Sequence, residues 1–111
     1  MNRKRELILD MIQAFKEAGV DEEALKMAYD YGATTGVPGL VYYNETVPIY
    51  EKNTRLIWDL VNELADECGY RDPVTFIGVT HQVTIYDHTD LANYMVWMVA
   101  EVCGSYIAGE W

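Results

Sequence analysis

The chain has 111 residues, of which 50% are hydrophobic, and its 18 Asp and Glu against 8 Lys and Arg give a net charge of −10. This length favours a single domain over residues 1–111, and the apolar half of the composition excludes an intrinsically disordered chain. No run of about 18 apolar residues is available to span a membrane, and no clean apolar region follows the N-terminus as in a secretory signal, so we expect a cytoplasmic protein.

Two helices are predicted in the N-terminal third. Residues 3–18 repeat apolar side chains with the 3.6-residue period of an amphipathic helix, and Gly19 ends that helix. Asp21 is a suitable N-cap for a second helix, which has two further carboxylates in its first turn and ends at Gly32. The Gly- and Pro-rich residues 32–39 then predict turns.

The middle of the chain contains the clearest helical pattern. Residues 54–68 repeat the apolar stripe for almost four turns. A short helix is predicted before it, with Thr46 as the N-cap and Pro48 in the first turn. Another short helix is predicted over residues 73–78, and Asp72 is its cap.

The C-terminal third combines a weak strand pattern with a long helix. Residues 81–86 alternate apolar and polar side chains, which is typical of a strand, and residues 40–43 are the candidate to pair with it. Residues 89–107, capped by Asp87 or Thr89, form the long helix. We therefore expect a mainly α, compact single-domain fold of four to five helices, with one small two-stranded element left open.

The predicted helix over residues 89–107 is apolar on two opposite sides. A helix of this kind lies either at the centre of a fold or at an interface with a second subunit. In the second case the helix would form a homodimer through an uncharged face. The residues of that face are Trp97, Ala100 and Gly104.

A motif in the middle of the chain is similar to a known family. Tyr31-Gly-Ala-Thr-Thr-Gly-Val-Pro-Gly-Leu40 is followed by Tyr42-Tyr43, and then by the 53–69 helix and Tyr70. Over residues 29–70 this pattern resembles a family of small uncharacterised bacteriophage proteins. The resemblance implies a phage-encoded protein in the cytoplasm of a bacterial host, and it brings no catalytic residues with it.

The common catalytic patterns are absent. The glycine-rich segment lacks the Gly-Lys-Ser/Thr ending of a phosphate-binding loop, and Ser105, the only serine, lies in a predicted helix. Cys68 and Cys103 are interpreted as buried free thiols. His81 and His88 fit no tight metal spacing, although a small hydrolase that uses them with nearby carboxylates stays an alternative. We expect a protein that is not an enzyme and uses no cofactor or metal.

The carboxylates offer the most informative functional pattern. Four of them lie at spacings of four, three and one residues on the outer face of the 54–68 helix, and we call this set the acidic ridge: Asp59, Glu63, Asp66 and Glu67. Neighbours at such spacings are about 5–6 Å apart, which is near the phosphate spacing along a DNA strand. A second patch that would extend the ridge consists of Asp21, Glu22, Glu23 and Asp30.

The charge disfavours direct binding of nucleic acid or anionic membranes and favours a partner with a basic surface. With the phage resemblance, the acidic ridge predicts a non-catalytic inhibitor, anti-CRISPR or anti-restriction, that occupies the basic nucleic-acid site of a host defence protein. The candidate aromatic anchors of this contact are Tyr42, Tyr43 and Tyr50. Arg3, Lys4 and Arg5 oppose this interpretation unless the N-terminus lies away from the ridge. The alternative is a homodimeric interaction or assembly module with no nucleic-acid mimicry.

Overall fold

The computed structural model describes residues 2–35 and 43–110, apart from the side chains of residues 31–35 and 43–45. The helices are α1 (Arg3–Glu17), α2 (Glu22–Thr35), α3 (Tyr43–Lys52), α4 (Thr54–Glu67), α5 (Pro73–His81) and α6 (His88–Ile107). Neither described stretch contains a strand. The prediction of a mainly α fold is confirmed, with six helices in place of four to five and without a two-stranded element in the described residues.

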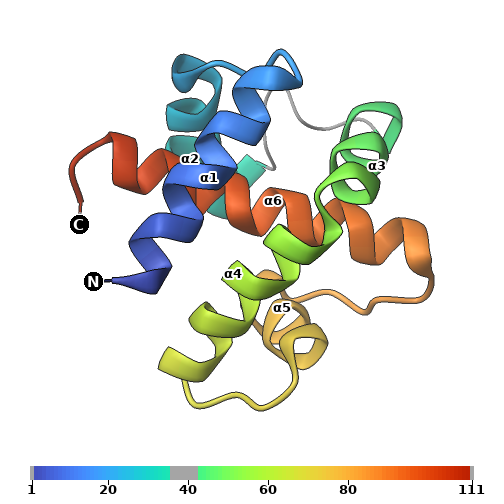
Figure 1. Ribbon diagram of the computed structural model, residues 1–111. Coiled ribbons are helices and arrows are strands. Elements are labelled where there is room, and N and C mark those ends of the chain that lie inside the picture. The colour runs from blue at the N-terminus through green and yellow to red at the C-terminus, as the bar shows by residue number, and fades with distance from the viewer. Residues whose placement is uncertain (1, 36–42, 111) are drawn as a thin grey trace.

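Helix α6 is the centre of the fold. Figure 1 shows it crossing the middle of the molecule, and it contacts each of the other five helices. Side chains on several of its faces are fully buried, namely Ala92, Met95, Val96, Val99, Ala100 and Cys103. Of the two positions expected for a helix that is apolar on opposite sides, the structure shows the central one.

Helices α1 and α4 form close to their predicted bounds because each has one apolar stripe. The stripe of α1 places Ile8, Met11 and Phe15 in the core, and that of α4 places Ile57, Leu60 and Val61 there. In both cases the residue after the C-cap is the predicted glycine, and it has a positive φ, 87° at Gly19 and 82° at Gly69.

Helix α3 begins earlier than the sequence suggests. Thr46 lies inside it and is not its N-cap, because the Thr46 hydroxyl instead donates a hydrogen bond to Asn93 Oδ1 of α6 (2.9 Å). Both side chains are buried, so this bond satisfies two polar groups in the core. Pro48 likewise lies inside the helix and not in its first turn.

The predicted strand over residues 81–86 is wrong. Helix α5 continues to His81, and Gln82 ends it in the left-handed conformation with a φ of 56°. The chain then runs without regular structure to α6 (Figure 1). Of the predicted partner strand, residues 40–42 lie outside the described residues and Tyr43 begins α3. Alternation of apolar and polar residues therefore reflects alternating burial here, not pairing.

The described residues form a compact body. Their Cα radius of gyration is 12.6 Å, close to the value of about 13 Å typical of a folded chain of roughly 100 residues. Within these residues, no helix has both the length and the apolar character that a membrane crossing requires.

Candidate functional site

The acidic ridge forms on α4, beside the first turn of α1. Arg3 approaches two of its carboxylates, with Nη2 3.3 Å from Asp59 Oδ2 and Nε 3.4 Å from Glu63 Oε1. Lys4 Nζ lies 2.6 Å from Glu67 Oε1. Asp66 is exposed and has no ion pair with a described residue.

These contacts change what the ridge can do. The N-terminal cations lie on it, not away from it, so four carboxylates and two cations leave a net charge of −2. The Arg3 pairs are exposed, and pairs of this kind contribute about 0–1 kcal/mol each to stability, whereas the Lys4 side chain is only 16% exposed. The ridge is therefore a surface that binds cationic side chains, and the chain's own cations already occupy much of it.

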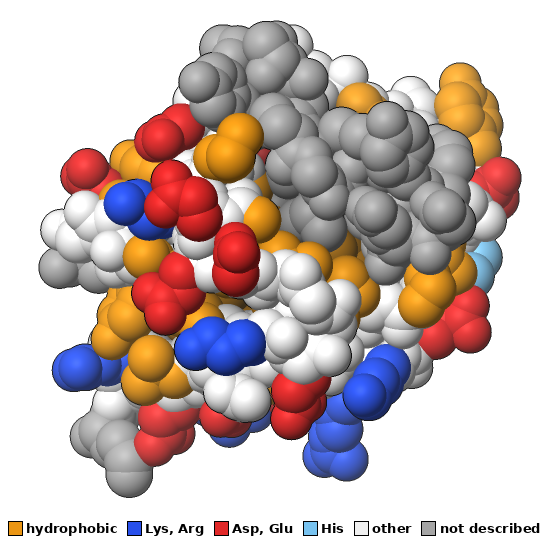
Figure 2. Space-filling model, turned by 90° about the horizontal axis from the view of Figure 1, so that it is seen from above, with side chains coloured by type: hydrophobic (Ala, Val, Ile, Leu, Met, Phe, Trp, Pro, Cys, Tyr) orange, Lys and Arg blue, Asp and Glu red, His pale blue; other side chains and the backbone are white. Residues whose placement is uncertain are grey.

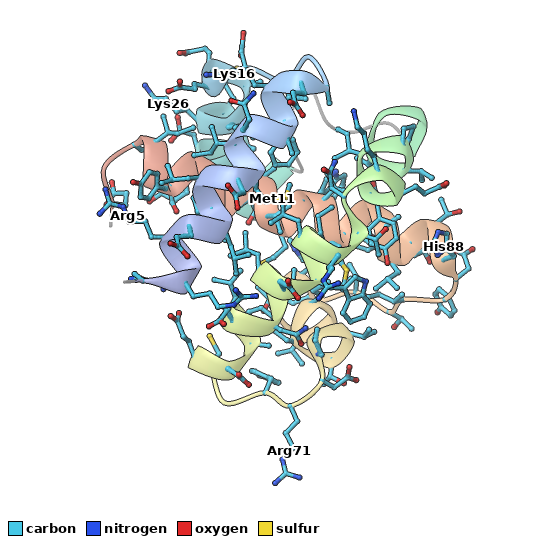
Figure 3. The ribbon with its side chains drawn as sticks, viewed as in Figure 1. Arg5, Met11, Lys16, Lys26, Arg71 and His88 are labelled. Carbon is cyan, nitrogen blue, oxygen red and sulfur yellow. The ribbon has the colours of Figure 1, made fainter. Side chains whose placement is uncertain are left out.

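The second acidic patch does not extend the ridge. Asp21 is the N-cap of α2, and its Oδ1 accepts a hydrogen bond from the Ala24 N–H at 2.9 Å. Glu22 Oε2 lies 3.7 Å from Lys16 Nζ. Figure 3 shows Lys16 at the opposite end of α1 from Arg5, and Lys16 is thirteen positions after Arg3, a rise of about 20 Å along the helix. In Figure 2, which views this end of the molecule from above, carboxylates and cations are interspersed.

The predicted tyrosine anchors do not form an exposed cluster in the described residues. Tyr42 lies outside these residues, and Tyr43 begins α3 with an undescribed side chain. Tyr50 is only 4% exposed, and its hydroxyl accepts a hydrogen bond from Trp58 Nε1 at 2.8 Å. Tyr50 is therefore a core residue and not a surface anchor.

Part of the predicted dimer face lies inside the fold. Ala100 and Gly104 are buried, and a Cβ on Gly104 would lie 2.8 Å from both the Leu25 carbonyl carbon and Tyr29 Cβ of α2. Trp97 is partly buried and packs edge-on against the Tyr94 ring, 5.4 Å between centroids. Helix α2 therefore covers the predicted face at Gly104.

The histidines and cysteines lie in separate environments. His81 is partly buried, and this burial lowers the pKa of its imidazole. Its Nε2 atom has no hydrogen-bond partner among the described residues. His88 is exposed, and its ring lies beside that of Tyr50. Cys103 is buried as predicted, whereas Cys68 is exposed at the C-cap of α4 because that helix ends before it. The described residues contain no group of three His, Cys, Asp or Glu that could hold a metal ion.

Sequence reasoning missed Glu101, which lies in a stripe of partly buried residues along α6. Tyr94, Trp97 and Glu101 share this stripe, and the His81 ring lies against Tyr94, 5.7 Å between centroids. Burial raises the pKa of the Glu101 carboxyl to about 7, and its Oε1 is buried without a hydrogen-bond partner in the described part of the chain. A signal was present, because Glu101 is the only charged residue between Asp90 and Glu110.

Sequence reasoning also missed an open hollow between α5 and the residues that follow it. Its volume is about 370 Å³. It is lined by Val74, Thr75, Gly78, Val79, Val83, Thr84 and Ile85. Val79 is 55% exposed and the neighbouring Tyr86 84% exposed. The alternation of apolar and polar residues over 81–86, which predicted a strand, was the sequence feature that pointed to this surface.

The comparisons place the chain in a family. The model of a family described as a domain of unknown function, DUF7222, matches residues 5–111. No curated protein and no solved structure matches the chain. Because the family match spans almost the whole sequence, the chain belongs to the DUF7222 family.

Proposed function

We propose that the protein is a non-catalytic, phage-encoded binding protein that occupies the basic nucleic-acid site of a host defence protein. Its contact surface is the side of the molecule around the connection from α5 to α6. The observation that carries this proposal is an uncompensated set of carboxylates there. From Asp72 onward the chain has five carboxylates and no Lys or Arg.

Two of these carboxylates lie at the α5–α6 connection, and the third, Asp72, bonds Thr75 at the start of α5, a residue that lines the hollow beside that connection. Asp72 caps α5 and Asp87 caps α6, and Asp90 Oδ2 accepts a hydrogen bond from the Tyr86 N–H at 3.2 Å. None of the three has an ion pair with a described residue. Arg71, directly before Asp72, points away from the molecule (Figure 3).

The carboxylates on the α5–α6 side differ from those of the acidic ridge because they have no cationic partners among the described residues. A capping carboxylate keeps its negative charge while it accepts a backbone hydrogen bond, so these residues serve the fold and still attract a cationic partner. The ridge has lost half of its charge to Arg3 and Lys4. The α5–α6 side is therefore the better match for a basic site.

A charge-neutralising variant tests this function. Asp72→Asn/Asp87→Asn/Asp90→Asn removes three negative charges, and it keeps the caps because Asn and Asp are about equally good N-caps. We measure displacement of a fluorescent DNA duplex from a panel of restriction and CRISPR nucleases. The wild-type protein should displace DNA from its target, more weakly as salt rises, and the triple variant should lose at least about tenfold in apparent affinity.

The matched control removes three charges from the self-neutralised ridge. Asp59→Asn/Glu63→Gln/Glu67→Gln changes the net charge equally and should lose less than about threefold. Equal losses in the two variants would show that only net charge matters. A triple variant at the α5–α6 side that displaces DNA as well as wild type would reject the proposed surface.

A further inference from the structure

The end of α5 shapes the hollow beside it. Gln82 ends the helix in the left-handed conformation, and the Val83 N–H then donates a hydrogen bond to the Gly78 carbonyl at 3.0 Å, as in a Schellman motif. A Cβ on Gly78 would lie only 3.2 Å from the Val83 carbonyl oxygen. The missing side chain therefore permits this close approach, and both residues line the hollow.

Hydrogen bonds at its edges hold the hollow in shape. Asp72 Oδ2 accepts a bond at 2.7 Å from the hydroxyl of Thr75, a lining residue. Asp90 Oδ2 accepts a bond at 3.2 Å from the Tyr86 N–H, directly after the lining residue Ile85. A preformed hollow of this kind costs little conformational entropy to occupy.

The hollow fits a side chain of a partner protein better than a free small molecule. Its volume of about 370 Å³ lies near the lower end of the roughly 300–1,000 Å³ of ligand pockets, and such pockets bury most of their ligand. This hollow is open to solvent, so a free molecule would stay exposed, whereas a partner surface would close the opening. No charged residue lines it, and its lining residue Val79 is 55% exposed. An apolar side chain is therefore the favoured occupant.

The carboxylates near the hollow select the neighbours of that side chain. The hydrogen bonds from the Thr75 hydroxyl and the Val74 N–H lower the pKa of the Asp72 carboxyl, so Asp72 stays charged. Neither Asp72 nor Asp90 has an ion pair with a described residue. Both attract Lys and Arg of a partner.

The apolar lining and the nearby charges point to one occupant. We infer that the hollow binds an aromatic side chain of the partner protein, whose neighbouring Arg or Lys side chains bind Asp72 and Asp90. An aromatic side chain fits because aromatic residues are the usual anchors of interfaces, and Tyr86, 84% exposed and directly after Ile85, offers a second ring.

The same two chemical elements occur together on surfaces that bind exposed bases. There, aromatic rings stack on the bases and cations bind the phosphates. The hollow would therefore cover a ring on which nucleic acid otherwise stacks. This inference rests on the proposed function and specifies the chemistry of the partner.

Short peptides test the inference on the full chain. The probe is the tripeptide acetyl-Arg-Phe-Arg-amide, and the readout is the methyl NMR signals of Val74, Val79 and Ile85, which should shift saturably at millimolar peptide. Acetyl-Arg-Ser-Arg-amide lacks the ring and acetyl-Glu-Phe-Glu-amide reverses the charges, and each should bind at least about fivefold more weakly. Equal binding of either comparison peptide, or methyl signals that acetyl-Arg-Phe-Arg-amide leaves unshifted, would overturn the inference.

Variants of the chain identify the hollow as the site. Val79→Ser removes an exposed apolar lining residue, so the variant should fold and bind acetyl-Arg-Phe-Arg-amide at least about fivefold more weakly. Leu9→Ser, at an apolar residue of α1 that is 46% exposed, is the matched control and should bind like wild type. If the wild-type protein instead dimerises in sedimentation and Val79→Ser abolishes the dimer, a second copy covers the hollow and the inference is wrong.

A second pair of variants tests the neighbouring charges. Asp72→Asn/Asp90→Asn removes two negative charges and keeps an oxygen acceptor at both positions. It should weaken acetyl-Arg-Phe-Arg-amide at least about threefold at low salt and leave acetyl-Ser-Phe-Ser-amide unchanged. Asp59→Asn/Glu63→Gln removes the same charge from the acidic ridge and should leave both peptides unchanged. Equal losses in the two double variants would overturn the inference, because net charge alone would then explain the binding.

The two proposals fail separately. Peptide binding in the hollow without DNA displacement from any nuclease would retain the aromatic site and reject the nucleic-acid target. DNA displacement that Val79→Ser leaves unchanged would retain the function and reject the aromatic site.

Discussion

Glu101 shows how the central position of α6 alters a single side chain. An ordinary glutamate has a pKa of 4.5, but burial raises the pKa of the Glu101 carboxyl to about 7. The folded protein therefore holds a proton that the unfolded chain has released between these two values. The stabilisation that the protonated Glu101 carboxyl contributes is fully present below pH 4.5 and is lost as the pH rises toward 7. Because the side chain is only partly buried, this loss is on the order of 2 kcal/mol, less than full conversion of the shift would give.

Glu101→Gln tests this dependence. The neutral amide removes the buried charge, so the variant should be more stable than wild type at pH 8 by on the order of 2 kcal/mol, and about equally stable at pH 4, below both pKa values of the Glu101 carboxyl. Thermal unfolding at the two pH values measures the difference. Glu110→Gln, at an exposed position after α6, is the control and should match wild type at both. A Glu101→Gln variant that gains nothing at pH 8 would contradict the buried charge.

At the scale of elements, the contact between α2 and α6 depends on one glycine. In an open helix, Gly→Ala stabilises by about 1 kcal/mol, because alanine is the better helix former. Gly104→Ala should do the opposite and destabilise by about 3 kcal/mol, since its Cβ would press on Leu25 and Tyr29. Urea unfolding of the variant and the wild type measures the change in the free energy of unfolding and therefore its sign. A stabilised variant would show that α2 does not cover this face.

Local patterns predicted the elements well and their partners poorly. The stripes of α1 and α4 and the caps at Asp72 and Asp87 were correct, because each depends on residues a few positions apart. The strand was wrong, because alternation records which side chains are buried and not whether the backbone is paired. Spacing likewise placed the ridge carboxylates on α4, but the Arg3–Asp59 contact joins residues 56 positions apart. No local pattern carries that information.

At the scale of the whole molecule, the distribution of charge matters more than its total. Removing Arg3 and Lys4 changes the net charge from −10 to −12 and leaves the four carboxylates of the ridge without these partners. Lys26→Ala/Lys52→Ala makes the same change in total charge at two residues of α2 and α3 for which no ion pair with a described residue is seen. The two double variants therefore separate the local field of the ridge from the field of the whole protein.

Arg3→Ala/Lys4→Ala should bind a fluorescent oligo-arginine peptide several-fold more tightly than Lys26→Ala/Lys52→Ala does at low salt. The reason is that neighbouring carboxylates about 5–6 Å apart act together on a polycation once their own cations are gone. The difference should vanish near 1 M salt, where the screening length is about 3 Å. Fluorescence anisotropy titrations of the peptide at low salt and at 1 M salt measure this difference in affinity. Equal affinities at low salt would mean that the ridge adds nothing beyond total charge. The Arg3 pairs are exposed and contribute little to stability, whereas the Lys4 side chain is largely buried, so Arg3→Ala/Lys4→Ala should still fold with a loss of on the order of 2 kcal/mol in total.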